Sequence, residues 1–142
     1  MTDSYIVDFE KREVAWPVKV QIPKDDGSGQ FKERQLTLTY ILLSRDELNE
    51  WRERDLEAFS DGTPMDDMAR VVRLFRAKFR SSKEDMNRLL EHVTNWNAID
   101  RKGEPVPFSR ETLRQVLALD PRLFTAAYDG LMEASGEVPR KN

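Results

Sequence analysis

Two apolar segments with a period of two constrain the fold of this chain more than any other feature. A period of two is typical of strands with one buried face. Asp26, Gly27 and Gly29 lie between the segments and favour a turn. We therefore expect an antiparallel β-hairpin over about residues 14–43. The alternating residues are Val14, Trp16, Val18, Val20 and Ile22 in the first segment and Leu36, Leu38, Tyr40 and Leu42 in the second.

Pro17 lies inside the first segment and has no N–H group to donate to a neighbouring strand. It therefore predicts an edge strand or a bulge at this point. Ile41 and Leu43 add apolar residues to the opposite face of the second segment, and this face either packs within the core or meets another chain. An exposed edge offers strand addition to a partner. A further alternation over residues 5–9 predicts a short third strand.

The rest of the chain is mostly helical in pattern. Ser44 and Glu47 have the spacing of a capping box, and Ser109 and the pair Asp120-Pro121 are typical helix starts. The fold class predicted is α+β, a single domain in which an N-terminal antiparallel β-hairpin packs against a mostly helical C-terminal part. The predicted helices cover about residues 44–60, 65–94, 109–118 and 120–135, followed by a polar tail at 136–142.

The helical pattern over residues 65–94 permits one helix or two. The apolar positions keep the same phase on both sides of Ser81-Ser82, as one continuous helix requires. The sequence from Ser82 to Asp85 also resembles a new helix start. We favour two helices or a kink.

Composition excludes several kinds of chemistry. The chain has no Cys and one His, which excludes disulfides, thiol catalysis and a multi-histidine metal site. No phosphate-binding loop, dinucleotide fingerprint or nucleophile elbow is present. We therefore expect no catalytic residue, no cofactor and no metal. His92 is expected either on a helix surface or at a helix C-terminus, where a cation interacts favourably with the dipole.

A basic stripe lies in the middle of the chain, opposite the apolar helix face. Residues 65–83 hold six Lys or Arg against two Asp, whereas residues 44–61 hold three Arg against seven acidic residues. The basic stripe could bind phosphates of a nucleic acid. The interpretation we favour is mutual neutralisation of the acidic and basic helices, as neighbours or across subunits, because no aromatic residues interleave the stripe. A plain solvated face is the third interpretation. The stripe consists of Arg70, Arg73, Arg76, Arg80 and Lys83.

The segment from Val93 to Ser109 is the most distinctive part of the sequence. A valine-containing helix end runs into Trp96, then into a short turn with Gly103, and then into Pro105-Val-Pro-Phe-Ser109. Together with the two short helices that follow and the strand–loop–strand front, it resembles the small tail assembly chaperones of long-tailed phages and prophages. That family often has Gly two residues after the Trp, where this chain has Ala98.

The resemblance implies a non-catalytic role in the cytoplasm of a bacterial host. Members of that family bind the tape measure protein, keep it soluble and help to recruit tail tube protein. The alternative function is a small prophage nucleic-acid-binding or regulatory protein that uses the basic stripe; no membrane partner is expected. The apolar residues of the Trp96 turn either contact a partner or another subunit of a homo-oligomer, or plug the local core. These candidate partner-binding residues are Trp96, Ile99, Val106 and Phe108.

Overall fold

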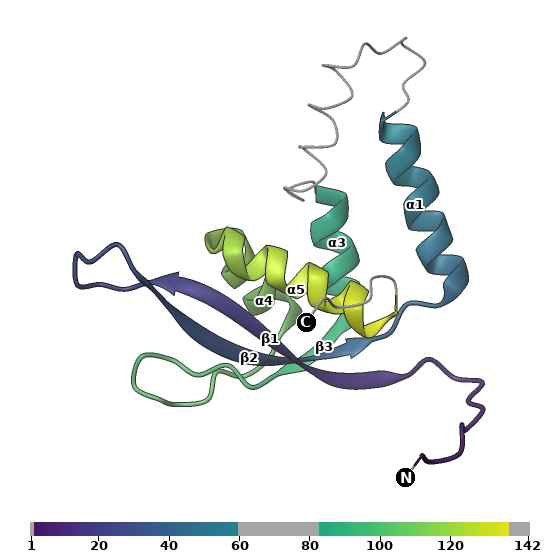
Figure 1. Cartoon of the computed structure of the whole chain (residues 1–142), viewed down its shortest axis with the longest axis horizontal. Coiled ribbons are helices and arrows are strands. Elements are labelled where there is room, and N and C mark those ends of the chain that lie inside the picture. The colour runs from purple at the N-terminus through teal and green to yellow at the C-terminus, as the bar shows by residue number, and fades with distance from the viewer. Residues whose placement is uncertain (1, 60–82, 137–142) are drawn as a thin grey trace.

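A three-stranded antiparallel sheet lies against helices in the computed structural model, which describes residues 2–59 and 83–136 (Figure 1). Strand β1 spans Glu13–Pro23 and strand β2 spans Phe31–Ile41. The two strands pair in the predicted hairpin, in a register that sets Val18 opposite Leu36. The predicted α+β class and the predicted hairpin are both confirmed.

The strand order β1-β2-β3 places β1 at an edge of the sheet. Pro17 therefore lies on an edge strand, as its missing N–H predicts. The inward face is also as predicted, because Leu38 and Tyr40 are fully buried in the central strand.

The third strand is not where the alternation over residues 5–9 predicted it. Those residues belong to no strand and are exposed, so that prediction is wrong. Strand β3 is instead Val93–Trp96, which pairs antiparallel with β2 and sets Trp96 opposite Leu38. The helix predicted to continue to residue 94 ends at His92 for the same reason, because pairing with β2 satisfies the backbone of the residues that follow.

Four helices belong to the described part of the chain: α1 (Arg45–Phe59), α3 (Lys83–His92), α4 (Arg110–Leu119) and α5 (Pro121–Ala134). The Ser44 hydroxyl accepts from the Glu47 N–H at 3.1 Å, and Glu47 Oε1 accepts from the Ser44 N–H at 3.1 Å, which confirms the capping box. Ser109 caps α4 and Asp120 caps α5. Residues 60–82 lie outside the described part, so whether residues 65–94 form one helix or two stays a prediction.

Helix α5 covers the inner face of the sheet, as Figure 1 shows. Its interior positions Tyr128 and Leu131 are fully buried, and the Tyr40 hydroxyl donates to the Ala127 carbonyl at 2.7 Å. Gly130 allows this close approach, because a Cβ there would lie 2.8 Å from the Tyr40 hydroxyl oxygen. None of the described helices is both long and apolar enough to cross a membrane.

Helix α1 is attached through a cluster of mixed character, which we call the α1–α3 junction. Trp51 of α1 is buried, with its ring edge-on to His92 at 5.3 Å and the Arg88 guanidinium 4.7 Å from its centre. Arg88 is itself buried and donates to Asp85 at 3.2 Å. This end of α1 therefore depends on charged and polar contacts as well as on apolar burial.

Candidate functional site

A small apolar cluster lies at the end of β3 and consists of Trp96, Val106 and Phe108. Trp96 is buried, and its indole N–H donates to the Val106 carbonyl at 2.8 Å. The Trp96 and Phe108 rings meet edge to face with centres 5.6 Å apart. Val106 and Phe108 are half-buried against the core. Three of the four candidate partner-binding residues therefore brace the local structure.

The chain between them forms a short, well-bonded hairpin, here called the Ile99 hairpin (residues 98–106). Its arms join through the Val106 N–H to the Ala98 carbonyl at 2.9 Å and the Asp100 N–H to the Glu104 carbonyl at 2.9 Å. At the tip, the Asp100 carboxylate accepts from the Glu104 N–H at 3.0 Å, and Gly103 has the positive φ that the turn requires. The hairpin is thus a defined projection.

Ile99, the fourth candidate, stands on this hairpin with 64% of its surface exposed. It borders a cleft of about 800 Å³ between the hairpin and β2, which we call the Ile99 cleft. Leu36 and Ala98 supply further apolar surface, and Arg34 and Arg101 supply positive charge. The cleft is lined by Arg34, Gln35, Leu36, Asn97, Ala98, Ile99, Asp100, Arg101 and Gly103.

Asn97 fixes the position of the cleft relative to the sheet. Its N–H donates to the Thr37 carbonyl at 3.2 Å, and its side-chain oxygen accepts from the Thr37 N–H at 2.8 Å. These two bonds continue the β2–β3 pairing by one residue. The β2 wall of the cleft was not predicted, because nothing local to Arg34 or Leu36 indicates which distant loop lies beside them.

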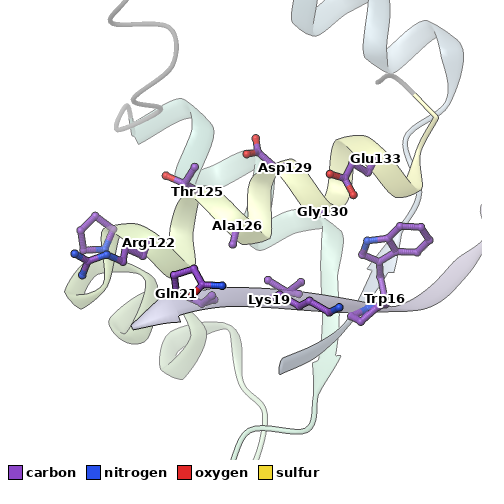
Figure 2. A pocket seen from close by; sticks show the side chains of 13 residues that line it. Trp16, Lys19, Gln21, Arg122, Thr125, Ala126, Asp129, Gly130 and Glu133 are labelled. Carbon is purple, nitrogen blue, oxygen red and sulfur yellow. The ribbon is translucent and has the colours of Figure 1, made fainter. Parts of the chain in front are cut away.

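A second hollow, the β1–α5 groove, has a volume of about 530 Å³ (Figure 2). Helix α5 runs alongside β1, with Arg122 near Gln21 and Glu133 near Trp16. The groove was missed in the sequence, although a glycine in the middle of an apolar helix, here Gly130, can signal close backbone approach. Its lining residues are Trp16, Pro17, Val18, Lys19, Val20, Gln21, Pro121, Arg122, Thr125, Ala126, Asp129, Gly130 and Glu133.

The prediction of a helix C-terminus for His92 is confirmed, but the alternative of a helix-surface position is wrong. It is the last residue of α3 and is buried, with Nδ1 2.7 Å from the Arg88 carbonyl and Nε2 3.3 Å from Glu47 Oε2. Sequence spacing could not show this, because Glu47 lies 45 residues away. The ring holds α1 to α3 and borders neither the Ile99 cleft nor the β1–α5 groove.

The structure shifts the pKa of two groups, Glu47 at the α1–α3 junction and Tyr40 beneath α5. Burial raises the pKa of Glu47, but hydrogen bonds from the Ser44 N–H and hydroxyl, Lys11 and His92 outweigh it and lower the pKa to about 2. Burial, helped by nearby carboxylates, raises the pKa of Tyr40 above its ordinary value. Tyr40 is therefore a neutral hydrogen-bond donor inside the core.

The predicted basic stripe falls mostly outside the described residues. Arg70, Arg73, Arg76 and Arg80 lie there, and Lys83 is exposed at the first position of α3. Within residues 2–59 and 83–136, no group of three or more acidic or histidine side chains is placed to hold a metal ion.

Comparisons with protein-family models, with curated proteins and with solved structures found no match to this chain.

Proposed function

We propose that this chain is a non-catalytic tail assembly chaperone that binds the tape measure protein during phage or prophage tail morphogenesis, in the cytoplasm of a bacterial host. The observation that carries the proposal is Ile99, which is 64% exposed on a braced hairpin beside a cleft. The resemblance of the Val93–Ser109 segment supplies the identity of the partner.

The chemistry of the Ile99 cleft suits a helical partner. An amphipathic helix buries its apolar stripe in a groove through side chains spaced three and four residues apart. Ile99, Leu36 and Ala98 offer apolar contacts for such a stripe. Arg34 and Arg101 border the same cleft and complement acidic residues beside the stripe.

The proposal gives the four candidate residues two different tasks. Ile99 contacts the partner, whereas Trp96, Val106 and Phe108 hold the hairpin in place. A site of this kind is effective because its contact residue stands on a rigid support. Substitution of Ile99 should therefore weaken partner binding, whereas substitution of Trp96 should lower the stability of the fold.

Coexpression with the tape measure protein from the same genome tests the proposal. We expect the two proteins to copurify, and Ile99→Asp to abolish copurification without changing the melting temperature, because a carboxylate is unfavourable in an apolar contact. Leu119→Asp is the matched control, since Leu119 is 84% exposed on α4 and outside the cleft. Equal loss in both variants, or in neither, would contradict the proposal.

A further inference from the structure

The outer edge of β1 carries unpaired backbone groups at defined positions. The Leu42 N–H donates to the Arg12 carbonyl at 2.9 Å, and the Lys24 N–H donates to the Gln30 carbonyl at 2.8 Å. The register between these bonds is unbroken, so the backbone N–H and C=O groups of even-numbered residues in β1 point towards β2. The backbone groups of odd-numbered residues therefore point away from the sheet. This leaves the N–H and the C=O of both Lys19 and Gln21 available to an added strand.

Pro17 divides this edge into two halves. It also faces outward, where it offers a carbonyl but no N–H, and a proline at this point blocks regular strand addition. The half that contains Lys19 and Gln21 lies beside Arg122, whereas Glu133 lies near the Trp16 end (Figure 2). The half that contains Lys19 and Gln21 therefore has the cationic Arg122 at its border, whereas the acidic Asp129 and Glu133 lie further along α5.

An apolar segment near the N-terminus lies outside the core of the described residues. We call residues 5–9 the apolar arm. Tyr5 is 87% exposed and Phe9 is 97% exposed, and Figure 1 shows this end leading away from the sheet. In an extended conformation Tyr5, Val7 and Phe9 share one face and Asp8 lies on the other.

The apolar arm complements the Lys19–Gln21 half of the groove. With Tyr5, Val7 and Phe9 turned towards α5, Asp8 lies on the same face of the sheet as Lys19. Residues 2–10 hold three acidic side chains and no Lys or Arg, which suits the cationic border. Five residues are enough to use the open groups of both Lys19 and Gln21.

Within its own chain the arm cannot span this half, because only Tyr5 could come as far as Lys19 and no residue of the arm could reach Gln21. Arg12 is fixed beside β2, and the three steps from Arg12 back to Phe9 span at most about 11 Å. The seven steps from Arg12 to Lys19 span about 23 Å along the strand. Lys11 is held in addition by its ion pair with Glu47 at 3.0 Å.

We propose that residues 5–9 of one copy add as a strand to the Lys19–Gln21 edge of a second copy, inside the β1–α5 groove. Backbone hydrogen bonds from β1 give this contact its direction, and the alternate arm side chains fill the groove. The chain then associates with itself through a surface separate from the Ile99 cleft. Because it needs no tape measure protein, this proposal stands or falls independently of the proposed function.

Analytical ultracentrifugation of the purified full chain over a range of concentrations tests it. We expect the mean mass to rise above one chain as concentration increases. Val7→Asp places a charge in the groove, so it should weaken self-association at least about tenfold. In the described part of the chain Val7 is 66% exposed, so this variant should keep the melting temperature of the parent protein.

A pair of proline variants tests the edge itself. Lys19→Pro removes an outward N–H from the half that the arm uses, without removing a bond to β2, and should abolish self-association. Ala15→Pro removes an outward N–H from the other half and should leave self-association unchanged. Circular dichroism of both variants checks that the sheet has formed.

Three results would overturn the proposal. These are a purified chain that stays monomeric at every concentration, a Val7→Asp variant that associates as the parent does, and proline variants that behave alike. A monomeric chain in which Lys19→Pro weakens copurification with tape measure protein, while Ala15→Pro does not, would assign the groove to that protein instead.

Discussion

The two places where helices join the rest of this molecule are built in different ways. Helix α5 meets the sheet through the small residues Ala127 and Gly130, which lie against the fully buried Tyr40. Helix α1 meets α3 through Trp51, but the surrounding groups include Glu47 and Arg88. Apolar burial is insensitive to pH and salt, whereas charged contacts respond to both. The α1–α3 junction should therefore yield first when conditions change.

The largest expected effect comes from the apolar cluster around Trp96, which contains no charged group. Trp96→Ala removes a buried ring that packs on Phe108 and bonds Val106. We expect a loss of about 3–5 kcal/mol in the free energy of unfolding, measured by urea denaturation. If the variant instead kept its stability and lost only partner binding, Trp96 would be a contact residue and not a brace.

A second test concerns the close approach of α5 to the sheet. Gly130→Ala forces a Cβ against the Tyr40 hydroxyl, at a cost of about 1–3 kcal/mol that the better helix propensity of Ala offsets by about 1 kcal/mol. In a Tyr40→Phe background the hydroxyl is gone, so the same substitution should cost less. Additive effects in this double-mutant cycle would show that Tyr40 does not set the approach.

At the α1–α3 junction, Glu47 makes stability depend on pH. Its pKa falls from 4.5 to about 2 on folding, so its contribution is complete above about pH 4.5 and is lost as pH falls towards 2. Glu47→Gln keeps an oxygen for the Ser44 N–H but removes the charge, so it should cost about 1–2 kcal/mol at neutral pH and should flatten the acid limb of the stability curve. An unchanged acid limb would contradict this role.

The smallest effect is expected at the exposed edge of the same junction. Lys11 is 60% exposed in its pair with Glu47, so Lys11→Gln should cost about 0.2–1 kcal/mol, and less in high salt. Thermal unfolding at two salt concentrations measures it. A larger or salt-independent loss would place Lys11 among the buried supports.

Local patterns in the sequence predicted local structure. The alternation from Val14 to Ile22 and the capping box at Ser44 both predicted what the structure contains, because each depends on residues near one another. The four-residue strand β3 was missed because Val93 continues the apolar spacing of α3, and only the distant pairing with β2 makes it a strand. The apolar arm was mispredicted in the opposite way: its alternation is real, but it pairs with no strand in the described part of the chain.

The candidate site was predictable in part for the same reason. The distinctive residues around Trp96 indicated the right segment, and the bond to Val106 and the ring of Phe108 separate its braces from Ile99. The β2 wall of the Ile99 cleft and the β1–α5 groove depend on contacts between distant parts of the chain, which neither spacing nor composition encodes.

Amide hydrogen exchange of the chain, alone and in complex with the tape measure protein, tests most directly that the Ile99 cleft receives this partner. We expect slower exchange on binding at residues 97–103 and at Gln35 and Leu36, with no change at Lys19 and Gln21 when the concentration of the chain is held constant. Protection confined to β1 and α5, with the Ile99 hairpin unchanged, would contradict it.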